Sequence, residues 1–121
     1  MIATTIAMAF AGLLVLGGSW VAAQTVRGDT KNGQVLYEQH CLRCHGQKLD
    51  GNGPDSRSLI VAPANLTSPR SRGKTDWELL LAISHGVVFS PMHGWQDRLT
   101  QDQIQDVLAY IRMMAPFDAV S

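Results

Sequence analysis

Apolar residues recur with the period of an amphipathic helix in three segments, and no segment alternates apolar and polar residues long enough to predict a strand. The clearest helix lies near the C-terminus, where Thr100 predicts the N-cap, Gln103 completes a capping box and Pro116 forbids continuation. Its apolar positions are Ile104, Val107, Leu108 and Ile111. One wide face of this helix is therefore expected to be buried.

A second helix is predicted to begin after Thr75, whose side chain caps it together with Glu78, and to stop at Gly86. Its apolar positions are Leu80, Leu81 and Ile83. Beyond it, residues 87–98 are expected to be irregular, because proline and glycine interrupt any regular pattern there.

The first helix is predicted from Thr30 to about Cys44, with Asp29 or Thr30 as its N-cap. Its inward candidates are Val35, Leu36 and Tyr37. Residues 46–71 contain several glycines and prolines and predict a long loop, in which Ser56 to Leu59 is the only possible helical turn. The whole pattern predicts an all-α fold of three main helices and long loops.

Length and charge narrow the class of protein. The 121 residues include 10 Lys and Arg against 10 Asp and Glu, which predicts one small domain and argues against a nucleic-acid partner. The uncharged start of the chain, with an apolar run from Ile6 to Leu16 and small residues before Gln24, predicts a signal peptide over residues 1–23 and a domain over residues 24–121. An uncleaved membrane anchor is the alternative, because no cation precedes the apolar run and the uncharged stretch is long enough to span a bilayer.

The two cysteines carry the chemistry of the chain. A mature domain of about 98 residues has a marginal core, and a disulfide between Cys41 and Cys44 would close too small a loop to add much stability. The string Cys41-Leu42-Arg43-Cys44-His45 is the CxxCH signature of c-type haem attachment: two thiols one helical turn apart can each add to one vinyl group of a porphyrin, with His45 as the proximal iron ligand. Three other interpretations of this string fit less well. A thioredoxin-type redox pair requires a βαβ context, which the sequence does not offer, and a zinc site requires a second pair of ligands, which is absent from the sequence. A structural disulfide is possible but does not use His45.

Residues 30–114 resemble the small monohaem class I cytochromes c of bacteria. Gly33 and Tyr37 match the glycine and aromatic residue of the family's first helix, and Val107 and Tyr110 match the pair on its last helix. The other shared elements are Cys41, Cys44, His45, Gly46, the loop 51–54, the segment 63–67 and a methionine in a Pro/Gly loop before the last helix. The resemblance implies a cytochrome c-like fold around one haem c, bound covalently through Cys41 and Cys44.

That methionine is Met92, and the resemblance implies that it is the sixth iron ligand, opposite His45. Met113 and Met114 lie on or beside the last helix, where methionine usually fills the core. His93 departs from the family, which commonly has a proline after the methionine, and it is the alternative sixth ligand.

The other expected cofactor contacts follow from the same resemblance. The backbone carbonyl of Pro54 is the first choice of acceptor for the second ring nitrogen of His45, with Pro63 behind it. Trp95 is expected to pack on the haem, to hydrogen-bond a propionate or to serve as an ordinary core aromatic. A basic cluster before the second helix, which predicts a solvated loop, propionate neutralisation or a docking patch, comprises Arg70, Arg72 and Lys74.

Together these residues imply an electron carrier and not an enzyme, with one haem iron that cycles between the ferric and ferrous states and with redox proteins as donor and acceptor. The alternatives are a haem enzyme or gas-binding protein with an open or labile sixth site, and a fixed cytochrome subunit of a periplasmic oxidoreductase complex. The signal predicts a periplasmic location, and membrane association, facing the periplasm, is expected only if residues 1–23 are retained.

Overall fold

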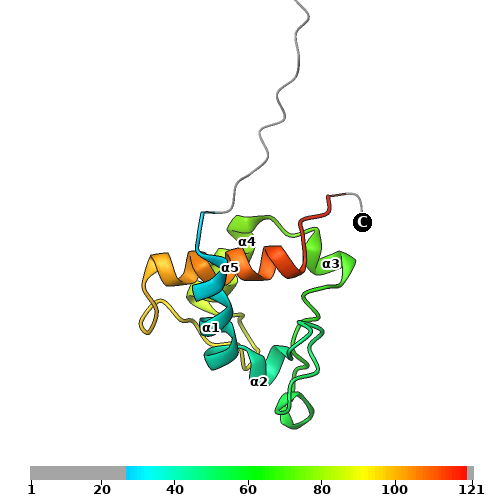
Figure 1. Cartoon of the computed structure of the whole chain (residues 1–121). Coiled ribbons are helices and arrows are strands. Elements are labelled where there is room, and N and C mark those ends of the chain that lie inside the picture. Colours follow the sequence, from blue (N-terminus) through cyan, green and yellow to red (C-terminus); the bar gives the residue numbers. More distant parts are fainter. Residues whose placement is uncertain (1–26, 120–121) are drawn as a thin grey trace, which may run out of the picture.

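The structure, a computed structural model, describes residues 27–119, so the predicted signal peptide or anchor lies outside the described residues. The elements are α1 (Thr30–His40), α2 (Leu42–His45), the 3-10 turn η1 (Ser56–Ser58), α3 (Pro69–Arg72), α4 (Asp76–His85) and α5 (Gln101–Met114) (Figure 1). Between residues 27 and 119 no strand forms, and a single antiparallel bridge joins Gly86 to His93. None of the helices in this range has the length and apolar character that a bilayer crossing requires.

The longer helices begin where the capping residues predict. The Asp29 carboxylate accepts hydrogen bonds from two backbone N–H groups of the first turn of α1. Thr75 and Thr100 each form a complete capping box, which fixes the first turns of α4 and α5. The predicted first helix is divided at Cys41, but its hydrogen bonding continues, because Cys41 N donates to Tyr37 O at 2.8 Å and His45 N donates to Cys41 O at 2.9 Å.

The crossing of α1 and α5 forms the centre of the core (Figure 1). A Cβ atom at Gly33 would overlap the carbonyl oxygen of Asp106, so this glycine lets the two helix backbones approach closely. The rings of Tyr37 and Tyr110 pack across the same crossing with centroids 5.3 Å apart. The buried cluster consists of Leu36, Tyr37, Leu49, Leu79, Ile83, Trp95, Leu99, Ile104, Val107, Leu108, Tyr110 and Ile111.

Two expectations about burial are wrong. Val35 is 49% exposed, because Gly33, Leu36 and Tyr37 are the residues of α1 that face inward. On α4, for which the sequence indicated apolar positions without a buried face, Leu79 is buried in the core and Leu81 is 38% exposed. Met113 and Met114 are also exposed and do not fill the core, because α5 turns its other face towards α1 and α4.

The predicted loop 46–71 contains more helix than expected. The turn at Ser56 is confirmed as η1, but the additional short helix α3 forms at Pro69. Ser68 caps this helix by accepting from Ser71 N, and proline is favoured in a first helical turn. The helix brings Arg72 and Ser71 into contact with the rest of the domain.

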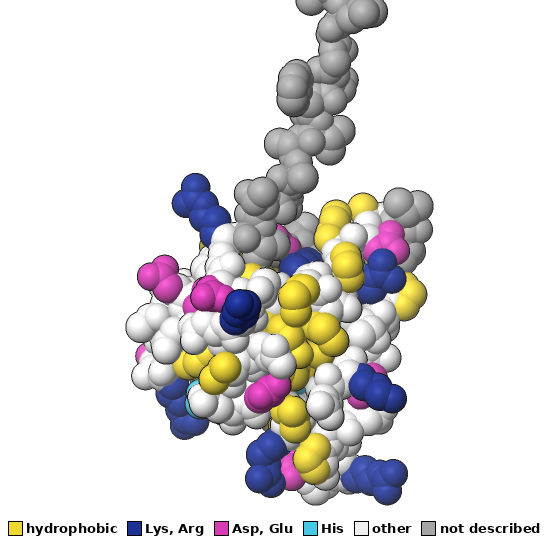
Figure 2. All heavy atoms as spheres, viewed as in Figure 1, with side chains coloured by type: hydrophobic (Ala, Val, Ile, Leu, Met, Phe, Trp, Pro, Cys, Tyr) yellow, Lys and Arg dark blue, Asp and Glu magenta, His cyan; other side chains and the backbone are white. Residues whose placement is uncertain are grey.

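Charged side chains of both signs are spread over the viewed surface, with hydrophobic side chains exposed between them (Figure 2). One ion pair reaches the interior: Arg112 of α5 is 8% exposed, and its Nε lies 2.6 Å from the carboxylate of Asp76 at the start of α4. The same guanidinium donates to the backbone carbonyl of Lys74. These bonds attach α4 to α5 and so fix the position of the segment that precedes α4.

Candidate functional site

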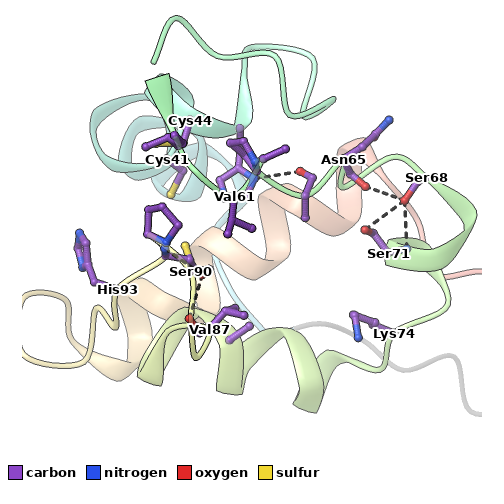
Figure 3. Close-up of a pocket in the computed structure, with 18 of the residues that line it drawn as sticks. Cys41, Cys44, Val61, Asn65, Ser68, Ser71, Lys74, Val87, Ser90 and His93 are labelled. Carbon is purple, nitrogen blue, oxygen red and sulfur yellow. Dashed lines mark hydrogen bonds between the residues drawn. The ribbon is translucent and has the colours of Figure 1, made fainter. Parts of the chain in front are cut away.

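A cavity of about 670 Å³ opens among α2, the loop 59–65, α4 and the hairpin 86–93 (Figure 3). This volume lies within the range of about 300–1,000 Å³ that is usual for cofactor sites. The cavity collects predicted residues from two distant parts of the chain, namely Cys41, Cys44, His45, Met92, His93 and Trp95. The tertiary structure therefore assembles one site from the attachment motif and the methionine loop.

The two thiols lie on the wall that α2 forms, and Figure 3 shows them side by side. Both are free and partly buried. The backbone N–H groups of Cys44 and His45 donate to the Cys41 carbonyl at 3.2 and 2.9 Å, so a single helical turn separates the two sulfur-bearing residues. Burial, aided by the neighbouring Cys44, raises the pKa of the Cys41 thiol to about 12, so this thiol is neutral at pH 7.

His45 is fixed by one hydrogen bond from its ring. Its Nδ1 atom lies 3.1 Å from the backbone carbonyl oxygen of Ala64. Because a carbonyl oxygen can only accept, Nδ1 carries the proton and Nε2 keeps the lone pair that a metal needs. Burial lowers the pKa of His45, and this effect exceeds that of the hydrogen bond to Ala64, which raises it. The net lowering favours the neutral imidazole.

The prediction that Pro54 supplies this carbonyl is wrong. Pro54 follows Gly53, whose N–H donates to Cys44 O at 3.1 Å, and it does not line the cavity. The loop instead crosses itself at Gly51, where a Cβ atom would lie 2.7 Å from the Pro63 carbonyl oxygen. This crossing carries the next carbonyl, that of Ala64, to the imidazole, so Pro63 lines the cavity without accepting the bond.

Met92 is held by a tight hairpin. Val87 N donates to Met92 O at 2.9 Å, and Met92 N donates to the Ser90 hydroxyl at 3.1 Å. That hydroxyl in turn donates to the Val87 carbonyl at 2.9 Å. The Met92 side chain is partly buried against the core and lines the cavity. The hairpin thus fixes the backbone on both sides of the thioether.

His93 and Trp95 occupy the edge of the cavity. The His93 ring packs on Trp95 with centroids 4.5 Å apart, and its Nδ1 lies 3.1 Å from the Gly94 carbonyl oxygen. Figure 3 shows His93 at the side of the cavity, away from Ser71 and Lys74. Trp95 is both a core residue and a cavity residue, and it also contacts the His40 ring at 5.0 Å and the Arg98 guanidinium at 5.7 Å. His93 is therefore held as a packing partner of Trp95.

Sequence reasoning missed much of the cavity wall. The unpredicted apolar lining consists of Leu59, Val61, Ala62, Ala64, Ala82 and Val87, and the unpredicted polar lining includes Asn65, Ser68 and Ser71. The Ser68-Pro69 pair was the one local signal for α3, since serine caps and proline begins helices. The basic cluster is divided: Arg70 and Lys74 line the cavity, whereas Arg72 pairs with Asp118 at 3.1 Å.

The donor set fits covalent haem c. Two thiols and an imidazole project from α2, a thioether comes from a separate hairpin, and the wall between them is largely apolar. Imidazole and thioether are the axial ligands of cytochromes c, and the thiols are the groups that bind the macrocycle covalently. A helical fold around such a cavity defines a c-type cytochrome.

Comparison with known proteins agrees with this class. Residues 28–111 match the family described as cytochrome c oxidase, cbb3-type, subunit III, and the chain belongs to this family. It is also 29% identical over 100 residues to cytochrome c6 of Gloeothece citriformis (strain PCC 7424), in an alignment that covers 82% of this chain and 83% of that protein.

Solved structures show the same fold. The chain matches the reducing HAO-like protein complex of Kuenenia stuttgartiensis with a TM-score of 0.62 and 31% identity. The match covers 71% of this chain and 42% of that chain, so this chain spans less than half of that chain's length. It matches the c-type cytochrome KustC0563 with a TM-score of 0.51 and 26% identity, over 71% and 96% of the two chains. It matches the c-type cytochrome NirC with a TM-score of 0.51 and 27% identity, over 71% of this chain and 93% of that chain. The cytochrome c-like fold is confirmed, and the protein is an electron-transfer haem protein whose cofactor is haem c.

Proposed function

We propose that this protein is a one-electron carrier, not an enzyme, in which His45 and Met92 are the two axial ligands of the haem iron. The observation that carries the proposal is the single cavity that brings an imidazole from α2 and a thioether from the hairpin 86–93 to the two thiols. Haem c bound there would supply reversible one-electron exchange between ferric and ferrous iron.

The chain's own residues would keep this site unchanged between the two oxidation states. The Ala64 carbonyl orients the His45 ring and strengthens it as a donor, because a hydrogen bond to the second ring nitrogen raises ligand basicity. The hairpin bonds of Val87 and Ser90 fix the backbone of Met92. With both ligands bound no coordination position is left for a substrate, which favours a carrier over a catalyst.

We further propose that residues 1–23 direct export to the bacterial periplasm and that residues 24–121 form the cytochrome domain. Mass spectrometry of the protein isolated from periplasm and from membranes tests this. A periplasmic form that begins near Gln24 would support cleavage of the signal. A membrane-bound form that begins at Met1 would show that the apolar segment is an anchor.

The redox partners of a free carrier would bind weakly through a small interface, since a carrier must dissociate quickly. A fixed subunit of a larger oxidoreductase is the second candidate, and membership in a family described by an oxidase subunit favours it. Size-exclusion chromatography of native extract separates the two, because a free carrier elutes as a single chain, whose mass is 13.2 kDa before the signal is removed, and a subunit elutes with a complex.

The ligand assignment is tested by optical spectra of the ferric holoprotein. Wild type is expected to show the weak red absorption band of sulfur-to-iron charge transfer. Met92→Ala should abolish this band, and the matched variant His93→Ala should retain it. Absence of the band in wild type, or its survival in Met92→Ala, would refute the assignment, and prompt carbon monoxide binding by ferrous wild type at neutral pH would favour an open or labile sixth site.

A further inference from the structure

The cavity has two chemically different ends (Figure 3). The thiols of Cys41 and Cys44 lie at the end that α2 forms. The opposite end is formed by α3, the residues before it and the start of α4, and there the lining becomes polar. Its polar residues are Asn65, Ser68, Arg70, Ser71, Lys74 and Glu78. A cofactor that fills the whole cavity would therefore meet apolar walls near the thiols and polar groups at its far edge.

The hydroxyl groups at this end are held in a defined arrangement. The Ser68 hydroxyl donates to the Asn65 carbonyl at 2.7 Å and also lies 3.2 Å from the Ser71 hydroxyl. Ser71 is only 9% exposed. Since the single proton of Ser68 is used by Asn65, the Ser71 hydroxyl is left to donate either to Ser68 or into the cavity. Ser71 is thus a buried donor placed beside the polar end.

The net charge of this end is positive. Arg70 and Lys74 are its cations, and Glu78 is the one carboxylate among the described residues that line the cavity. Glu78 is already engaged, because one of its oxygens accepts from Thr75 N at 2.7 Å and from Thr75 Oγ1 at 2.9 Å. Lys74 Nζ lies 3.9 Å from the other oxygen, on an exposed pair that solvent screens.

We propose that this end, comprising Arg70, Ser71 and Lys74, binds the two propionate carboxylates of the cofactor; the inference rests on the proposed attachment of haem c through Cys41 and Cys44. The vinyl-bearing and propionate-bearing edges of the macrocycle are opposite one another, so attachment at the thiol end directs the carboxylates towards the cations. Carboxylates that enter a partly desolvated site require such paired charges and donors. Arg72 takes no part, because its guanidinium is bound to Asp118.

Cations beside the haem disfavour the more positive ferric state and so raise the reduction potential. The experiment compares the midpoint potentials of Arg70→Met, Lys74→Met and the double variant with that of Lys48→Met, which removes an exposed cation that does not line the cavity. Each single variant should shift the redox equilibrium about threefold towards ferric, and the double variant about tenfold, which equals about 59 mV for one electron. Lys48→Met should change it less than about twofold.

A structural readout accompanies the potentials. Nuclear Overhauser contacts in the ferrous holoprotein should connect the propionate methylene protons with the side chains of Ser71 and Lys74, and Ser71→Ala should alter the propionate shifts. Contacts of both propionates with other residues, or a double variant that behaves like Lys48→Met, would overturn the proposal. Failure of the proposed function would be seen separately, as loss of the red band or of the covalent haem in the wild-type protein.

Discussion

The hydroxyl group of Tyr37 offers the sharpest test of how the helix crossing supports the attachment motif. Tyr37 is 1% exposed, and its hydroxyl donates to the backbone carbonyl of Gly46 at 2.7 Å. Gly46 directly follows His45, so this bond connects α1 with the end of the CxxCH segment. Burial raises the pKa of Tyr37, which keeps the hydroxyl protonated as a donor at neutral and moderately alkaline pH.

Tyr37→Phe keeps the ring but removes one of two hydrogen bonds to the Gly46 carbonyl, which still accepts from Leu49 N at 3.1 Å. The net contribution of one such hydrogen bond to stability is about 0.5–1.5 kcal/mol. For a domain of this size, a loss of 1 kcal/mol lowers Tm by about 4–8 °C. Guanidinium unfolding of the holoprotein, followed by circular dichroism, gives the free energy of unfolding, and we expect it to fall by about 0.5–1.5 kcal/mol with the slope unchanged.

Tyr110→Phe is the matched control. Tyr110 is also buried and packs on Tyr37, but its hydroxyl makes no hydrogen bond to another described residue. Its removal should therefore cost less than about 0.5 kcal/mol. If the two variants lose equal stability, or if Tyr37→Phe loses less than about 0.3 kcal/mol, the bond to Gly46 does not support the attachment segment in the way described.

Three further perturbations test the packing around the site. Gly33→Ala places a Cβ atom onto a backbone carbonyl of α5 and should cost about 1–3 kcal/mol in chemical denaturation. Arg112→Met should cost about 2–3 kcal/mol, less than the ~3–5 of a fully buried pair, because the Asp76 side chain is 25% exposed; unchanged stability would show that this pair does not hold α4 on α5. Arg43 lowers the pKa of Asp55, so their pair stabilises the fold above about pH 4 and this contribution is lost as the pH falls through the lower folded pKa. The stability difference between wild type and Asp55→Asn should therefore shrink in acid, as unfolding curves at several pH values would show.

Local signals predicted the helices well because caps act within a few residues. Thr75 with Glu78 and Thr100 with Gln103 were read correctly as capping boxes, and Gly86 ends α4 as expected. Burial was predicted less well, since helical periodicity gives the spacing of an apolar face without showing which residues meet a partner. Leu81 and Leu79 illustrate this, because both are leucines on α4 and only the packing against α5 distinguishes them.

The candidate site also has some features that the sequence predicted and others that depend on tertiary contacts. The CxxCH motif was found from sequence because it is a short pattern whose chemistry requires particular residues at fixed spacing, and Met92 was selected by the resemblance of its Pro/Gly loop to the family. The acceptor for His45 was misassigned to Pro54, because the choice among neighbouring carbonyls depends on how the loop crosses at Gly51. The packing of His93 on Trp95 was equally invisible, since a ring can turn to either side of the same backbone.

By itself, the sequence determined the cofactor, the class of fold and the ends of the main helices, because covalent attachment and helix capping are properties of adjacent residues. Only the tertiary structure decided that Ala64 orients the imidazole of His45, that Arg70 and Lys74 line the cavity and that Arg72 turns to Asp118 instead. These outcomes depend on contacts between segments far apart in the chain, which close packing fixes and which no local pattern records.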